Sequence, residues 1–101
     1  MPVISVSRWQ ITQDEARRIV RDAASQIRQA GAQSVTLGRI TTGQNADQTV
    51  VAVTYENFET MGRAMQALQN NQQYQQRLNE ARQKGQLLDR TVIEVEEITQ
   101  S

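Results

Sequence analysis

The amino-acid types that most often perform chemistry are scarce in this chain. It contains no His and no Cys, so the commonest general base, the usual zinc and haem ligand and the thiol nucleophile are all missing. Ser5, Ser7 and Ser34 consequently have no His to activate them as nucleophiles. The sequence therefore excludes serine and cysteine triads, and it excludes metal binding through His or Cys.

The remaining polar residues show no pattern typical of a metal, phosphate or acid–base site. The carboxylates are too scattered for a metal cluster, and Gly38 and Gly43 do not form a phosphate-binding loop. Glu94 and Glu96 share one side of a predicted strand, which is more typical of charges that protect a sheet edge than of an acid–base pair. We expect no metal and no cofactor.

Size and charge limit the organisation of the chain and its partners. The length of 101 residues suits a single domain, expected over residues 1–101. Eleven basic side chains balance eleven acidic ones, so no overall field attracts nucleic acid or an anionic membrane. No apolar run approaches the ~20 residues of a membrane span, and Met1-Pro2-Val3 lacks the start of a secretory signal. A cytoplasmic protein without nucleic-acid or membrane partners is expected.

Hydrophobic periodicity and cap residues predict the elements that position any site. The sequence Thr12-Gln13-Asp14-Glu15 is a capping box, in which the Thr12 hydroxyl and the Glu15 carboxylate each satisfy a backbone N–H. The apolar positions between residues 58 and 81 change phase, so we expect one helix to stop at Asn70-Asn71 and a second to start. The expected elements are a strand Val3 to Ile11, a helix after Thr12 ending at Gly31, strands Ser34 to Ile40 and Thr49 to Tyr55, helices from Phe58 and from Gln72 or Gln73 to Gly85, and a strand Leu87 to Ile98.

This order of elements predicts an α+β fold. With right-handed crossovers, β-α-β-β-α-β gives a ferredoxin-like, four-stranded antiparallel sheet with its helices on one face. The strand over residues 49–55 carries Val51 and Val53 on one face and Val50 and Ala52 on the other. A strand that is apolar on both faces needs cover on both. We therefore expect a second copy of the chain to cover the face that the helices leave bare, as a homodimer.

The segment Met65-Gln66-Ala67-Leu68-Gln69-Asn70-Asn71-Gln72-Gln73-Tyr74, followed by Leu78, Ala81 and Gly85, resembles the dimeric α+β barrel superfamily. The resemblance covers nearly the whole chain through loose motifs. It is closest to the NIPSNAP-like and the antibiotic-biosynthesis-monooxygenase-like branches. It implies a homodimer whose sheets face each other and, as in some members, a pocket between the sheet and the helices of each subunit.

The resemblance implies two alternative functions. The first is binding of a small apolar or aromatic molecule, with cofactor-independent monooxygenase-like activity as in the quinol-type members. The second is an assembly or interaction module without catalysis or ligand. The haem-degrading branch uses a His as iron ligand, and this chain has none, so haem oxygenation by that route is not expected.

Seven residues are candidates for lining a pocket of this kind. The stacking walls are Trp9, Tyr55 and Tyr74, and the polar anchors are Arg8, Arg39, Asn57 and Arg90. Each has a structural alternative: Trp9 and Tyr55 as core or dimer packing, Tyr74 as the anchor of the short helix, and Asn57 as a helix N-cap. The arginines are alternatively surface charges.

Overall fold

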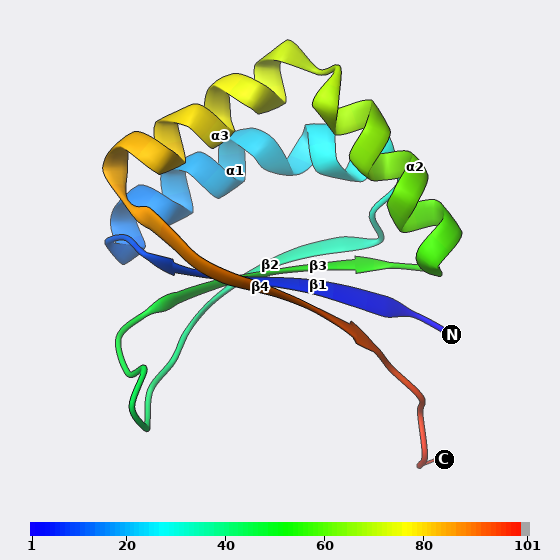
Figure 1. Ribbon diagram of the computed structural model, residues 1–101, viewed down its shortest axis with the longest axis horizontal. Helices are drawn as coiled ribbons and strands as arrows, with labels where there is room; N and C mark the ends of the chain where they lie inside the picture. The colour runs from blue at the N-terminus through cyan, green and yellow to red at the C-terminus, as the bar shows by residue number, and fades with distance from the viewer. Residues whose placement is uncertain (100–101) are drawn as a thin grey trace.

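The structure of the protein, a computed structural model, describes residues 1–99 and has the strands and helices in the predicted order (Figure 1). The elements are β1 (Val3–Gln10), α1 (Gln13–Ala30), β2 (Ser34–Arg39), β3 (Thr49–Tyr55), α2 (Phe58–Gln69), α3 (Gln72–Lys84) and β4 (Gln86–Glu94). The four strands form one antiparallel sheet in the order β2-β3-β1-β4. All three helices lie over one face of this sheet (Figure 1). The predicted ferredoxin-like α+β fold is confirmed.

The helix starts follow from side chains that satisfy free backbone N–H groups. Asn57 caps α2, where its Oδ1 accepts a hydrogen bond from the Thr60 N–H at 2.8 Å. Asn71 caps α3 in the same way through the Tyr74 N–H at 3.0 Å. The predicted break at Asn70-Asn71 is therefore confirmed, because a new cap restarts the helical path immediately after α2 ends.

The capping box at the start of α1 is only half formed. The Thr12 hydroxyl accepts a hydrogen bond from the Glu15 N–H at 3.3 Å, as predicted. The Glu15 carboxylate instead accepts a hydrogen bond from the Arg18 guanidinium at 2.7 Å. A charged partner one turn away on the same helix competes successfully with the neutral backbone N–H.

The last strand is shorter than predicted. It begins one residue earlier than expected, at Gln86, and ends at Glu94 instead of Ile98. Its last paired neighbour on β1 is Val3, and beyond this pair a single backbone hydrogen bond, from the Val95 N–H to the Pro2 carbonyl oxygen at 2.9 Å, joins the two segments. Glu96 therefore lies outside the strand, and only Glu94 stands on this sheet edge.

The core lies between the sheet and the helices in two separate clusters. Its larger part holds Val3, Ala23, Ile27, Ala32, Tyr55, Ala64 and Leu68. The smaller cluster, made by Trp9, Ile19 and Ala81, lies at the other end of β1. Ser5 and Ser7 are the residues of β1 that face the helices between Val3 and Trp9. The middle of the central strand therefore contributes no large apolar side chain to the core.

The opposite face of the sheet is apolar and no helix covers it (Figure 1). The register places Ile4 beside Thr54 and Ile93, and Val6 beside Ala52. This face, here named the open face, carries Ile4, Val6, Val50, Ala52 and Ile93. Ile93 is 46% exposed. The apolar character that the sequence predicted for both faces of β3 is confirmed.

Gly85, between α3 and β4, is a position where a side chain does not fit. A Cβ atom built there would lie 2.5 Å from the Gln10 carbonyl oxygen and 2.6 Å from the Ile11 Cβ. Its φ of −160° is open to any residue, so Gly85 is required by this close approach and not by a left-handed conformation. The turn that leads from α3 into β4 depends on it.

We expect Gly85→Ala to lower the free energy of unfolding by about 1 to 3 kcal/mol, because the backbone must move to relieve the overlap. The matched control is Gly62→Ala in α2, where a Cβ meets nothing within 4 Å. That change should stabilise the helix by about 0.5 to 1 kcal/mol. Urea denaturation of both variants measures the difference, and equal effects would contradict this account of Gly85.

Candidate functional site

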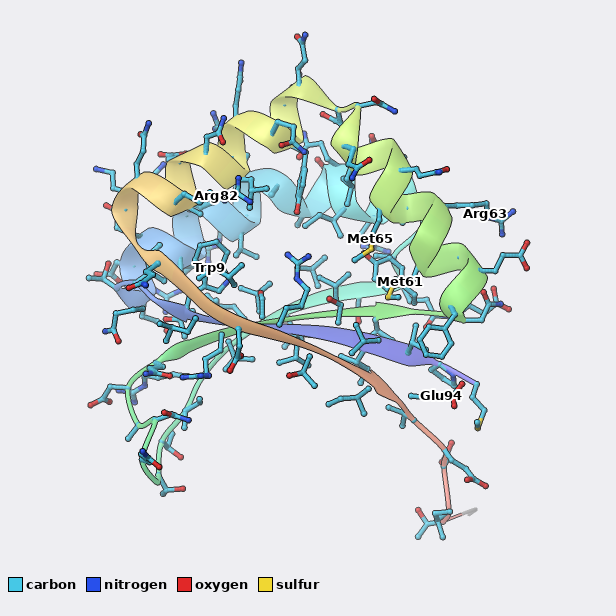
Figure 2. The ribbon with its side chains drawn as sticks, in the orientation of Figure 1. Trp9, Met61, Arg63, Met65, Arg82 and Glu94 are labelled. Carbon is cyan, nitrogen blue, oxygen red and sulfur yellow. The ribbon has the colours of Figure 1, made fainter. Side chains whose placement is uncertain are left out.

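A cavity of about 410 Å³ separates the helix-covered face of the sheet from the helices. Its floor comes from β1 and β3, and its walls come from α1, α2 and α3. Apolar side chains dominate the floor and walls: Ile11, Ala16, Ile19, Val20, Ala23, Ile27, Val51, Val53, Met65, Leu68, Leu78 and Ala81. Figure 2 shows Met65 directed from α2 toward the sheet and Trp9 beneath the helical layer. The size and the lining match those of small-molecule sites.

The cavity exists because Ser5 and Ser7 stand where the core would otherwise continue. Both serines line it, between the larger cluster at Val3 and the smaller one at Trp9. A dry void of this volume costs about 10 kcal/mol at the ~24 cal/mol per Å³ found for engineered cavities, which is comparable with the whole stability of a domain. The cavity is therefore in contact with water.

The mouth of the cavity lies along the edge strand β4. Lining residues that are exposed to solvent mark the rim, and these are Gln69, Arg82 and Arg90. Val92 also faces the helical layer, because it pairs with Ser5, yet it is 40% exposed. The helices thus cover β1 and β3 but leave part of β4 bare, and Figure 1 shows β4 at the front edge of the sheet.

Trp9 closes one end of the cavity with an indole ring that is held in place. The side chain is 7% exposed, and its Nε1–H donates a hydrogen bond to the Ser7 Oγ at 3.0 Å. The Ser7 hydroxyl in turn reaches the Val51 carbonyl oxygen at 3.5 Å. Because the polar edge of the indole is satisfied by the protein, the ring offers an apolar stacking surface.

Tyr55, Tyr74 and Arg90 are among the polar residues that line the cavity. Tyr55 ends β3 and is 3% exposed, and Tyr74 lies in the first turn of α3, where the Asn71 cap fixes it. Burial raises the pKa of the Tyr55 phenol above its usual 10.0; the nearby Tyr74 phenol adds to the rise and the Arg90 guanidinium opposes it. At neutral pH Tyr55 is therefore a hydrogen-bond donor and not a base.

The buried phenol predicts a loss of stability in alkaline solution. Because the folded-state pKa of Tyr55 is raised, its contribution is complete below pH 10.0 and is lost as the pH rises through the folded-state value. We expect the free energy of unfolding to fall above pH 10.0 by up to about 1.4 kcal/mol per pH unit for this one group. Denaturation of the wild type and of Tyr55→Phe against pH measures it, and parallel curves would contradict the assignment.

Three arginines line the cavity and differ in how their charges are balanced. Arg77 lies between two carboxylates, with Asp22 at 3.6 Å and Glu80 at 3.8 Å. Arg82 and Arg90 have no carboxylate within ion-pair distance in the part of the chain that the structure describes. No Asp or Glu of residues 1–99 lines the cavity. The site is therefore locally positive in a protein of zero net charge.

Four of the seven predicted site residues meet at this cavity: Trp9, Tyr55, Tyr74 and Arg90. The other three lie outside it. Arg8 points to the open face, where it pairs with Asp89 and hydrogen-bonds Gln48, and Arg39 pairs with Asp47 at the hairpin. Asn57 is the N-cap of α2.

Sequence reasoning missed the serines and two arginines, Arg77 and Arg82. Ser5 and Ser7 are not among the predicted site residues, although their parity with Val3 and Trp9 already places them on the core-facing side of β1. Two small polar residues at core positions of a central strand are the sequence signal of a cavity. Arg77 and Arg82 had no such signal, because their place in the cavity lining depends on how α3 crosses the sheet.

Metal-binding clusters and membrane-spanning helices are both absent from residues 1–99. Residues 1–99 contain no group of three or more acidic side chains placed to hold a metal ion. Within the same range, no helix combines the length and the apolar character needed to cross a membrane.

Comparison with known proteins identifies the fold. A family model described as a domain of unknown function, DUF6854, matches residues 6–92, and no curated protein matches the chain. SnoaB, a cofactor-independent oxygenase from Streptomyces nogalater, is 13% identical with a TM-score of 0.72, over 96% of this chain and 95% of that chain. A candidate antibiotic biosynthesis monooxygenase from Deinococcus radiodurans is 15% identical with a TM-score of 0.67, over 98% and 97%.

A third similar structure is an uncharacterized NIPSNAP-like domain protein from Burkholderia xenovorans, 12% identical with a TM-score of 0.66, over 99% of this chain and 90% of that chain. The two branches that the sequence resembled are therefore confirmed as structural neighbours. At these identities the likeness shows a shared fold, and the function has to be argued from the cavity.

Proposed function

Because the chain belongs to the DUF6854 family, a domain of unknown function, we propose its role from the site itself: it binds a small, largely apolar or aromatic molecule in the cavity. The observation that carries the proposal is a space of about 410 Å³ between the sheet and the helices of a 101-residue chain, open along β4. Protein interiors are normally packed without such voids. A small domain is only marginally stable, and an unfilled space of this size lowers its free energy of unfolding. Ligand binding explains why the space is present.

The cavity can hold a flat molecule by two kinds of contact. The Trp9 ring and the aliphatic side chains of α1 and β3 offer apolar surface, and each buried CH₂ group contributes about 0.8 kcal/mol. The phenols of Tyr55 and Tyr74 and the Arg90 guanidinium offer hydrogen-bond donors. The ligand would lie along the strands with its apolar end toward Trp9.

Cofactor-independent oxygenation is the finer form of this proposal. Its support is the fold shared with SnoaB, a cofactor-independent oxygenase. In such a reaction an electron-rich phenol itself reduces O₂: the phenol and O₂ give a quinone and water, so no external reductant is needed. The residues of this cavity would orient the phenol and donate hydrogen bonds to its oxygen, because the lining of residues 1–99 contains donors and no carboxylate base.

The binding proposal is tested by thermal shift with a panel of phenols, quinones and fatty acids. A molecule that binds the folded state raises the melting temperature by mass action, by an amount equivalent to about 2.7 kcal/mol at a concentration one hundred times Kd. If no member of the panel raises the melting temperature, the result contradicts the binding proposal and favours the alternative of an assembly module without a ligand. Oxygen uptake with the binding phenols then tests the oxygenase-like step.

The homodimer belongs to the same proposal, with residues 1–101 as one domain that pairs with its copy through the open face. What supports it is that Ile4, Val6, Val50 and Ala52 lie together on a face that no helix covers. Apolar patches of this kind on a sheet mark an interaction surface, and a self-complementary face forms a twofold dimer. Light scattering should report about 22.8 kDa, twice the 11.4 kDa of one chain.

A further inference from the structure

We propose that the ligand of the cavity is an aromatic carboxylate, and that Arg90 with the phenol groups of Tyr55 and Tyr74 holds its carboxylate. This inference rests on the proposed function and names the class of molecule that the same site takes. It follows from the charges around the cavity and from the side on which its polar residues gather. The apolar end of the molecule would lie against Trp9.

The first argument is the absence of a partner for Arg90. The arginines that contact carboxylates are Arg8, Arg17, Arg18, Arg39 and Arg77. Arg90 lines the cavity, and the structure of residues 1–99 gives it no carboxylate within 4.0 Å. A guanidinium at the mouth of an apolar cavity keeps its donors free for an oxyanion, and charge-assisted hydrogen bonds of this kind are stronger than neutral ones.

The second argument is the register of β4. Arg90 pairs with Ser7 of β1 and therefore faces the helical layer, although it lies on an edge strand with solvent beside it. Its side chain is exposed to solvent at the mouth while it lines the same cavity as the two tyrosines, and its positive charge acts to lower the pKa of the Tyr55 phenol.

The third argument is that the polar groups of Trp9 and Ser7 are already satisfied within the protein. The Trp9 Nε1–H and the Ser7 hydroxyl are already hydrogen-bonded to each other. Leu78 and Ala81 also lie beside Trp9 and add only apolar surface. The donors left free for a charged group of the ligand therefore include those of Arg90, Tyr55 and Tyr74, with Arg82 on the rim adding to the positive field.

Matched probes separate charge from shape. 2-Naphthoate and 2-naphthamide have the same ring and nearly the same outline, but only the first carries a carboxylate. Quenching of Trp9 reports binding without a label, because Trp9 is the only Trp of the chain and lines the cavity. We expect 2-naphthoate to bind at least about tenfold more tightly than the amide, because a charge-assisted hydrogen bond to its carboxylate strengthens binding. This difference in affinity should decrease as salt is added.

Two variants test whether Arg90 causes the preference for 2-naphthoate. Arg90→Gln should weaken 2-naphthoate binding about tenfold and leave 2-naphthamide binding nearly unchanged. The matched control is Arg63→Gln, since Arg63 projects from α2 away from the sheet (Figure 2). Far-UV circular dichroism and the melting temperature of Arg90→Gln confirm that the variant is folded. Rescue of part of the affinity by Arg90→Lys separates the charge from the geometry of the guanidinium.

The outcomes distinguish this inference from the proposal beneath it. Equal binding of the acid and the amide, or an unchanged preference in Arg90→Gln, overturns the carboxylate assignment while the cavity remains a ligand site. If neither probe quenches Trp9 and the wider panel also gives no thermal shift, the ligand proposal fails as a whole. A preference for the acid that Arg63→Gln removes and Arg90→Gln keeps also overturns the assignment, because the charge then acts outside the cavity.

Discussion

Replacing Ser5 with Leu is expected to abolish ligand binding while the protein stays folded. Ser5 faces the cavity from the central strand, between the two clusters of the core. A Leu side chain there would extend into the space that the ligand needs. Its burial should also raise the free energy of unfolding by about 1 to 2 kcal/mol, because it replaces water by apolar contacts with the walls.

Ser5→Leu is expected to lose ligand binding but gain stability, and these opposite effects test whether the cavity is the binding site. Binding is measured by thermal shift with any ligand of the wild type, and stability by urea denaturation. The control is Ser25→Leu, which adds the same atoms to an exposed position of α1 and should change neither property much. If Ser5→Leu binds the ligand as the wild type does, the molecule is held elsewhere on the protein and the site assignment is wrong.

Placing a Glu at Val6 is expected to prevent the proposed dimer from forming. Val6 lies on β1 in the open face, between Ala52 of β3 and Thr91 of β4. In a single subunit the new carboxylate reaches water, so the fold should survive. In the dimer each subunit would bury an unpaired charge, at a cost of several kcal/mol per ion, and 3 kcal/mol already weakens association more than a hundredfold.

Light scattering or sedimentation measures this change as a fall from about 22.8 kDa to the 11.4 kDa of one chain. The matched control is Gln66→Glu, which adds the same charge to an exposed position of α2 and should leave the dimer intact. If the wild type is monomeric at millimolar concentration, the proposed dimer is wrong. If Val6→Glu dimerises with wild-type affinity, the subunits contact each other through another surface.

Most of the fold could be predicted from local patterns because the caps are explicit. Thr12, Asn57 and Asn71 stand at the N-caps of the three helices, and the apolar parities of β3 read directly as two faces. The end of β4 could not be predicted, since β-branched residues continue to Ile98 while the ladder with β1 stops at Val3, next to Pro2, which has no N–H to donate. Strand ends depend on the neighbour as much as on the strand itself.

The site was predictable only in part because a cavity is a property of volume in three dimensions. The three aromatic candidates could be found from their size and polarity. Arg8 could have been separated from Trp9, since adjacent strand residues point to opposite faces. Arg90 could not have been assigned to the cavity from parity, because the register of β4 against β1 shifts between Arg8 and Trp9.

The joint between α2 and α3 determines how wide the site is. A single residue, Asn70, lies between the end of α2 and the cap at Asn71, and side chains on both sides of the joint, among them Gln69 and Tyr74, line the cavity. The tilt of α3 over the sheet thus depends on Asn70, which does not line the cavity. A change in the angle between α2 and α3 at this joint would therefore alter the size of the molecule that the cavity accommodates. No residue in contact with that molecule would need to be replaced.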